Sequence, residues 1–275
     1  MNYRNPQGRV RKRFKLLPLV IAAIIIAFQY FSSEKVTNPI TGETAHVSMS
    51  MDQEAALGLQ SYRKILSESR TINSGREFDM VVRVAERLAP VTGQAGANFE
   101  WSVSLIDSPQ ANAFCLPGGK IAVYTGILPI VQDEEGLAAV MGHEMAHAIA
   151  RHGSQRIFRQ QAMQTAMMGV QGSISDMSIE QQRMLIGLLG AGAQYGMILP
   201  FSREHESEAD YMGTLYMARA GYDPRAAIAL WQRMEEASSG QPPEFASTHP
   251  SHETRIQQLQ AWMPEMMEVY GKSRQ

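Results

Sequence analysis

The sequence contains very little cysteine, since Cys115 is the only one among 275 residues. A single cysteine excludes an intramolecular disulfide and any zinc module built from several cysteines. The 44% apolar and 19% charged residues exclude collagen-like, coiled-coil and wholly disordered proteins. A formal net charge of only −2 gives no reason to expect nucleic acid as a partner. What remains is a globular protein long enough for one large domain or two small ones.

Acidic residues are absent from residues 1–15, which carry six basic side chains and therefore a charge of +6. The other 260 residues sum to −8. An apolar run, Leu16–Phe31, follows the basic stretch directly. This order predicts a signal-anchor helix, with a cleaved signal peptide and a buried helix of a soluble protein as the alternatives. Because basic flanks stay in the cytoplasm, we expect an inner-membrane anchor with residues 34–275 in the periplasm, or secretion to the periplasm after cleavage.

The rest of the chain predicts an α+β fold that is mainly helical and holds a small β-sheet. Residues 34–50 are polar and indicate a linker after the tail and anchor of residues 1–33. Apolar spacing predicts helices over 52–70 and 76–89. Alternation predicts a strand over 99–106, and a second strand follows Gly118-Gly119. From about residue 133 the pattern is almost entirely helical, so we expect one main domain over 51–270.

The strongest motif is His143-Glu144-Met145-Ala146-His147. Residues four apart lie on one face of a helix, so both histidines can bind one Zn²⁺. Glu144 lies beside them, where its carboxylate can take a proton from the attacking water. The alternative is a chance match with two histidines that serve the fold. Three protein ligands are needed for a catalytic zinc site, so a third ligand would decide between the two interpretations.

An acidic segment near residue 206 offers that third ligand. Glu206 and Asp210 are four residues apart and share a helix face, whereas Glu204 and Glu208 lie about 200° from Glu206 and point away. We therefore assign Glu206 as the third ligand. Asp210 is predicted to orient a ligand histidine through its second ring nitrogen. An exposed acidic helix face is the alternative.

Together these motifs resemble the zinc metalloendopeptidase family that includes HtpX, BepA and LoiP, with mitochondrial relatives. Three further segments match: NAFCLPGGKIAVYTGIL (112–128), LPFSREHESEAD (199–210) and STHPSHETRI (247–256). The resemblance implies a zincin-like metallopeptidase domain with one Zn²⁺ per chain. It also implies endoproteolysis of unfolded or misfolded envelope proteins in protein quality control. Because no C-terminal repeat domain follows, the chain is most similar to the compact members.

The resemblance adds three less specific candidates to the site. His249 matches a histidine that can occupy the open metal position as a self-inhibitory plug, or it caps a turn. Arg255 matches an arginine near the active site that can stabilise an oxyanion, or it forms a surface ion pair. A third candidate is an edge strand that binds extended substrates, or a plain buried strand, formed by Asn112, Ala113, Phe114 and Cys115.

Two rival functions remain at this point. One is a zinc-binding chaperone or adaptor whose protease activity is latent or blocked by His249. The other is a membrane-tethered module in which zinc only stabilises the fold. Glu144 argues against the second, because a structural zinc site needs no general base.

Overall fold

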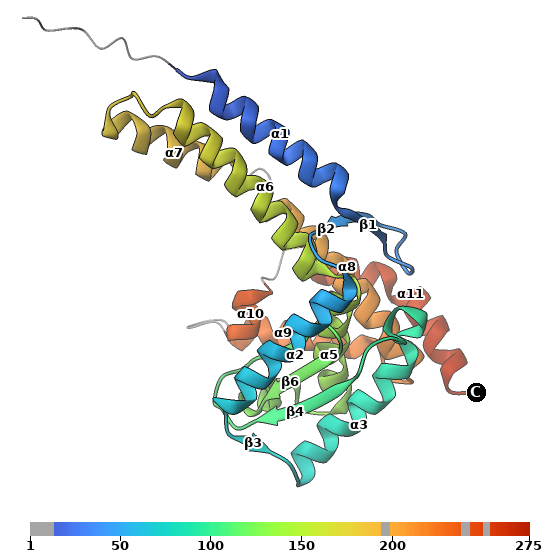
Figure 1. The fold of residues 1–275 in the computed structure, drawn as a ribbon. Coiled ribbons are helices and arrows are strands. Elements are labelled where there is room, and N and C mark those ends of the chain that lie inside the picture. Colours follow the sequence, from blue (N-terminus) through green and yellow to red (C-terminus); the bar gives the residue numbers. More distant parts are fainter. Residues whose placement is uncertain (1–13, 194–198, 238–242, 250–253) are drawn as a thin grey trace, which may run out of the picture. The chain divides into compact units, whose positions relative to one another are not determined.

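The computed structural model describes residues 14–193, 199–237, 243–249 and 254–275. The chain forms two compact units. The smaller unit comprises residues 1–33 and 157–200, and the larger comprises residues 34–156 and 201–275. The larger unit carries the small sheet and most of the helices, which confirms the mainly helical α+β class (Figure 1).

A four-stranded mixed sheet lies in the larger unit, in the order β3-β4-β6-β5. Its strands are β3 (Thr71–Ile72), β4 (Ser102–Ile106), β5 (Ala113–Leu116) and β6 (Lys120–Tyr124). β4 and β6 are parallel, and the other pairs are antiparallel. The predicted strand over 99–106 therefore begins three residues later, at Ser102. Gly118 and Gly119 both have φ near +80°, which allows the tight turn between β5 and β6.

Helices cover both faces of this sheet. On one face, Leu105, Ile121 and Val123 pack with α3 (Arg76–Val91) and α5 (Glu134–Ile149). On the other face, Ile106 and Ala122 pack with Tyr62 of α2 (Met51–Ser67). Burial on both faces explains why the β6 sequence KIAVY is an apolar run rather than an alternating one.

The helix α5 crosses α8 (Leu199–Arg219) at two glycines, which brings the two helix backbones very close. A Cβ at Gly142 would lie 2.9 Å from the Gly213 carbonyl oxygen, and a Cβ at Gly213 would lie 2.7 Å from the His143 nitrogen. No side chain fits at this crossing. The crossing places the histidines of α5 next to the carboxylates of α8.

The remaining elements of the larger unit are short or lie around this pair of helices. They are the 3-10 turns Gly93–Gly96 and Thr125–Ile127, α4 (Leu128–Val131), α9 (Arg225–Ala237), α10 (Glu244–Thr248) and α11 (Arg255–Ser273). The segment predicted as a linker contains an antiparallel hairpin of β1 (Glu34–Thr37) and β2 (Thr44–Val47). Gly42, at φ +75°, lies in the turn of that hairpin.

The smaller unit contains α1 (Leu16–Ser32), α7 (Ile179–Ala193) and most of α6 (His152–Ser173). Glycines allow α1 to pack closely on α6, because a Cβ at Gly169 would lie 2.6 Å from the Ala22 Cβ. Most of the large apolar side chains of α1 are exposed. Among the described residues, none of the helices combines the length and the apolar character needed to cross a membrane.

Candidate metal centre

The helix that carries the HExxH motif is buried almost along its entire length. Asp133 caps its N-terminus by accepting a 2.8 Å hydrogen bond from the Gly136 N–H, as the acidic residues at 133–135 predict. Four residues separate His143 from His147, so the two rings meet with their Nε2 atoms 3.1 Å apart. Such a short approach of two ring nitrogens is expected where both face one cation.

Helix α8 brings a carboxylate to the same point. Glu206 is only 1% exposed, and its two oxygens lie 3.3 Å from His143 Nε2 and 3.4 Å from His147 Nε2. A tetrahedral zinc ion with ligand bonds of about 2.0–2.2 Å separates its ligand atoms by about 3.3 Å. The three donor atoms therefore fit zinc in both chemistry and spacing.

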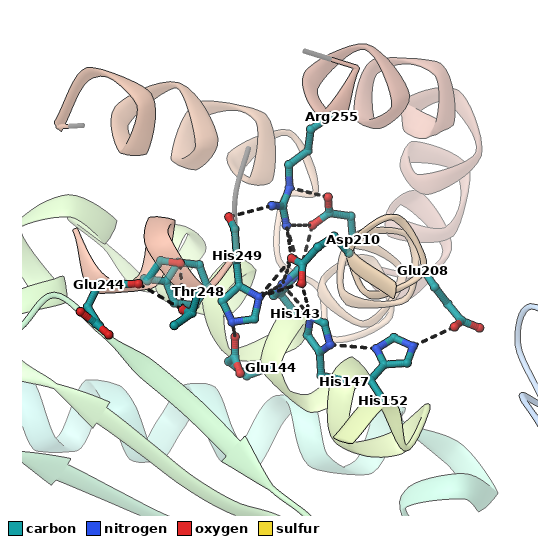
Figure 2. A network of polar contacts seen from close by, with 12 residues as sticks. His143, Glu144, His147, His152, Glu208, Asp210, Glu244, Thr248, His249 and Arg255 are labelled. Carbon is teal, nitrogen blue, oxygen red and sulfur yellow. Dashed lines mark hydrogen bonds and ion pairs between the residues drawn. The ribbon is translucent and has the colours of Figure 1, made fainter. Parts of the chain in front are cut away.

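A fourth donor comes from the residue that follows α10. His249 Nδ1 lies 3.2 Å from His143 Nε2 and 3.0 Å from a Glu206 oxygen (Figure 2). Its ligand atom clusters with those of the three residues above within 4.8 Å. If His143, His147 and Glu206 held a zinc ion, this ring would lie at the position that a catalytic site leaves open for water. His249 also ends α10, with its N–H donated to the Phe245 carbonyl, so both interpretations of this residue fit the geometry.

The charges of the cluster show how strongly it attracts a cation. Burial lowers the pKa of His143, but hydrogen bonds with Asp210 and Glu206 outweigh it and raise that pKa to about 9. Burial also dominates at His147, and it lowers the pKa of that ring well below the usual value. Although burial opposes ionisation of Glu206, the three histidines around it lower its pKa. The carboxylates around His143 therefore favour a positive charge at this point, as a metal-binding site does.

Two further charged side chains support these donors. Asp210 lies 2.9 Å from His143 Nδ1, as expected for a carboxylate that orients a ligand histidine. Arg255, the first residue of α11, is 1% exposed and pairs with both Asp210 oxygens at 2.6 Å. It also lies 3.4 Å from a Glu206 oxygen and 3.3 Å from the centre of the Trp231 ring. Arg255 is therefore a buried clamp on the carboxylates, and the alternative of a surface ion pair is wrong.

The carboxylate of Glu144 lies on the sheet side of the cluster. One oxygen is 3.1 Å from His249 Nε2, and the backbone of Cys115 in β5 lies close enough to the carboxylate to lower its pKa. Burial raises the pKa of Glu144, while the neighbouring histidines lower it. A buried carboxylate with a raised pKa and a position beside a metal centre is suited to accept and return a proton.

The predicted substrate strand is the edge strand β5, which pairs only with β6 in the described sheet. Ala113 and Cys115 are buried, and Phe114 is half-buried. Asn112, just before the strand, accepts the Tyr124 N–H through its backbone oxygen. The Cys115 thiol is buried, and this burial raises its pKa well above the usual value, so the thiol stays neutral. The structure thus places an edge strand directly beside Glu144.

Two residues that were not predicted to belong to the site also reach the centre. His152 contacts His147, and Glu208 contacts His152, each at 2.8 Å. His152 stacks on His205 with 3.9 Å between the ring centres. The only sequence signal for Glu208 was its place in the acidic segment, and that place indicated a side chain pointing away from Glu206. His252, in the segment 247–256 that matches the family, lies outside the described residues.

With this geometry in place, comparisons with known proteins identify the family. The model of "Peptidase family M48" matches residues 76–263. The chain is 38% identical over 232 residues to the mitochondrial metalloendopeptidase OMA1 of Schizosaccharomyces pombe, covering 82% of this chain and 66% of the relative. It is 31% identical to the mitochondrial metalloendopeptidase OMA1 of Homo sapiens, with coverage of 94% and 52%.

A bacterial relative matches over a similar range. The chain is 29% identical over 248 residues to the beta-barrel assembly-enhancing protease of Escherichia coli, covering 88% of this chain and 50% of that protein. It therefore spans between half and two thirds of the length of these three relatives. The matched range contains every candidate ligand and Glu144. The chain belongs to peptidase family M48.

Proposed function

We propose that this protein is a zinc-dependent endopeptidase that cleaves unfolded or misassembled proteins in protein quality control. The observation that carries the proposal is the cluster of His143, His147 and Glu206 at zinc spacing, with Glu144 beside it. The names of the relatives, a metalloendopeptidase and an assembly-enhancing protease, support this class of activity.

In this mechanism His143, His147 and Glu206 hold the metal. Zinc, when bound, polarises the scissile carbonyl and lowers the pKa of the attacking water toward about 7. Glu144 takes the proton from that water and delivers it to the leaving amine. Asp210 holds the ring of His143 through Nδ1. Arg255 holds Asp210, and its guanidinium is occupied by carboxylates, so we assign it a positioning role rather than contact with the oxyanion.

The substrate of this enzyme would bind as an additional strand on β5. An edge strand recognises extended backbone rather than a folded surface, which selects unfolded segments. Because the backbone of Cys115 lies near the Glu144 carboxylate, a peptide along 112–115 would pass next to the proton acceptor. The strand offers the substrate few exposed side chains, because Phe114 is half-buried and Ala113 and Cys115 are buried. We therefore expect recognition of the substrate's backbone rather than of particular side chains.

Metal removal tests the proposal directly. The purified full chain is expected to contain one zinc ion and to cleave an unfolded protein such as reduced casein. A chelator should stop the cleavage, and added zinc should restore it. His147→Ala should lose cleavage and bind zinc more weakly, because it leaves only His143, Glu206 and His249, with no position open for water. The proposal would be overturned by cleavage that persists in a chain shown to be free of metal.

A latent form of the enzyme, or a zinc-binding chaperone, is the second candidate function. It is favoured by His249, whose ring lies at the open vertex and also contacts Glu144 at 3.1 Å. A ring in this place would compete with both water and substrate. The latent enzyme and the chaperone differ in one respect: replacing His249 should increase the cleavage rate of the latent enzyme only.

His249→Ala is expected to increase the cleavage rate. If about a tenth of the molecules have the ring displaced at any time, the increase is roughly tenfold. Ser247→Ala, an exposed change on α10, serves as the matched control. The rate of casein cleavage by zinc-loaded protein is the measurement. A decrease would instead assign His249 a role in stabilising the transition state, and an absence of cleavage in both forms would favour the chaperone.

We also propose that the N-terminal segment attaches the protein to a membrane and that the larger unit lies on the periplasmic side. The supporting observations are the +6 charge of residues 1–15 and the exposed apolar side chains of α1, such as Phe28 at 72% and Phe31 at 84% exposure. Basic residues next to an apolar segment favour binding to anionic lipid.

Vesicle flotation measures this attachment. The full chain should float with vesicles that contain anionic lipid, and a chain lacking residues 1–33 should stay at the bottom of the gradient. Flotation of both forms would place the attachment elsewhere. If cells release a form that begins after residue 31, the segment is a cleaved signal instead.

A further inference from the structure

A second polar network lies behind His147, on the side away from Glu144. The Nδ1 atom of His147 is 2.8 Å from Nδ1 of His152, and Nε2 of His152 is 2.8 Å from an oxygen of Glu208 (Figure 2). His152 is 1% exposed, so this contact is made away from water. The mechanism above uses neither His152 nor Glu208.

Hydrogen-bond chemistry assigns a direction to this network. When His147 presents the lone pair of Nε2 to a metal, a neutral ring carries its proton on Nδ1. That N–H then donates to Nδ1 of His152, and the second ring carries its own proton on Nε2. The Nε2–H of His152 donates to the Glu208 carboxylate. Each donor meets one acceptor. Glu208, the last acceptor of this hydrogen-bond network, therefore fixes the tautomers of both His152 and His147.

The backbone is bent in a way that makes this contact possible. His152 follows His147 by five residues, and in a continuous helix these positions would be about 140° apart. Arg151 lies between α5 and α6 with φ +59°, a left-handed conformation that residues other than glycine rarely adopt. Arg151 is held there by Glu54 at 3.0 Å and by Glu34 at 3.2 Å. The bend returns His152 to His147.

The far end of the network is fixed by the β1–β2 hairpin. Asn38 donates to Glu208 Oε1 at 2.7 Å, and Thr41 donates to the same oxygen at 2.5 Å. Asn38 is buried, and both residues lie in the turn that connects the two strands. Glu208 thus accepts three hydrogen bonds, two of them from this turn.

We propose that His152 and Glu208 are positioning residues that set the tautomer and orientation of the ligand His147, and that the β1–β2 hairpin supports them through Asn38 and Thr41. Asp210 orients His143 by direct contact with its Nδ1. In both ligand histidines, the Nδ1 atom is thus linked to a carboxylate, either directly or through His152. The proposal rests on the proposed zinc site and adds this hairpin to its structural support.

Zinc affinity of the full chain, measured by competition with a chromophoric chelator, tests the proposal. His152→Ala is expected to weaken zinc binding by about 10–100-fold, and Glu208→Gln by a smaller factor, roughly tenfold. His152→Gln should recover part of the loss, because its amide oxygen can accept from His147 and its amide nitrogen can donate to Glu208. Glu204→Gln, which makes the same charge change at an exposed position of α8, is the matched control and should stay within about twofold.

The hairpin is tested by Thr41→Val, which should weaken zinc binding about threefold in the wild type and have no further effect in Glu208→Gln. The Co²⁺ absorption spectrum should change in His152→Ala but not in the control. Unfolding temperature in chelator shows whether each variant folds. If His152→Ala does not fold, Glu208→Gln and Thr41→Val decide the question.

Failure of this proposal can be told apart from failure of the proposed function. A wild-type chain that binds no zinc would refute both. A wild type that binds zinc, with Glu208→Gln and folded His152 variants within twofold of it, would overturn this proposal and leave the zinc site intact.

Discussion

Glu144→Gln is expected to lower the rate of peptide hydrolysis by about 10²–10⁴-fold, the range for loss of a general base. The amide has nearly the shape of the carboxylate but cannot take a proton. Its size is almost unchanged, so the packing of α5 against β5 should remain. Zinc content should be unchanged, because the cluster of ligand atoms does not include Glu144.

The measurement combines metal analysis with the rate of casein cleavage. Glu134→Gln is the matched control, since it makes the same charge change on the same helix at an exposed ion pair with Arg83. Cleavage by Glu144→Gln at the rate of this control would refute the proposed role. Loss of zinc together with cleavage would show instead that Glu144 supports the fold of the site.

Local periodicity predicted which side chains of α5 and α8 lie together in the cluster. The two ligand histidines, His143 and His147, are four residues apart, and so are the ligand Glu206 and its supporting carboxylate Asp210. A helix fixes the geometry of each pair without help from the rest of the chain. Gly118-Gly119 likewise predicted the start of the next strand, because the tight turn before it needs positive φ. These features depend on the nearest neighbours in sequence.

The support of the site depends on contacts that periodicity does not encode. The contact of His152 with His147 needs a left-handed residue, Arg151, where the sequence indicates a continuing helix. Glu208 was predicted to point away, and it does leave the face of Glu206, but a residue of α6 meets it there. The segment 34–50 looked like a linker because its partner in the fold, Glu208, lies more than 160 residues away.

The burial of Arg255 could not be predicted from the residues around it in the sequence. A lone arginine among polar residues indicates a surface position, since charged side chains are rarely fully buried. Here two carboxylates of α8 and the ring of Trp231 enclose it. The fold therefore carries a buried charge that must remain paired.

Arg255→Met is expected to lower the free energy of unfolding by about 3–5 kcal/mol, the range for removing one partner of a buried ion pair. Methionine keeps much of the apolar stem, so the loss comes mainly from Asp210, whose two oxygens would lose their contacts at 2.6 Å. For a domain of this size the unfolding temperature should fall by roughly 10 °C. The stability of Arg255→Lys should lie between that of the wild type and that of Arg255→Met. An ammonium group keeps the charge but cannot bind both carboxylate oxygens in the same plane.

The exposed pair of Arg225 and Asp223 provides the control for this measurement. Their side chains also approach to 2.5 Å, but Arg225 is 64% exposed, so Arg225→Met should cost less than about 1 kcal/mol. Both variants should be unfolded in urea with a chelator present, so that lost zinc does not enter the comparison. Equal effects of the two substitutions would refute the argument from burial. A large effect of Arg255→Met alone, in metal-free protein, would show that Arg255 holds Asp210 and Glu206 together before any metal binds.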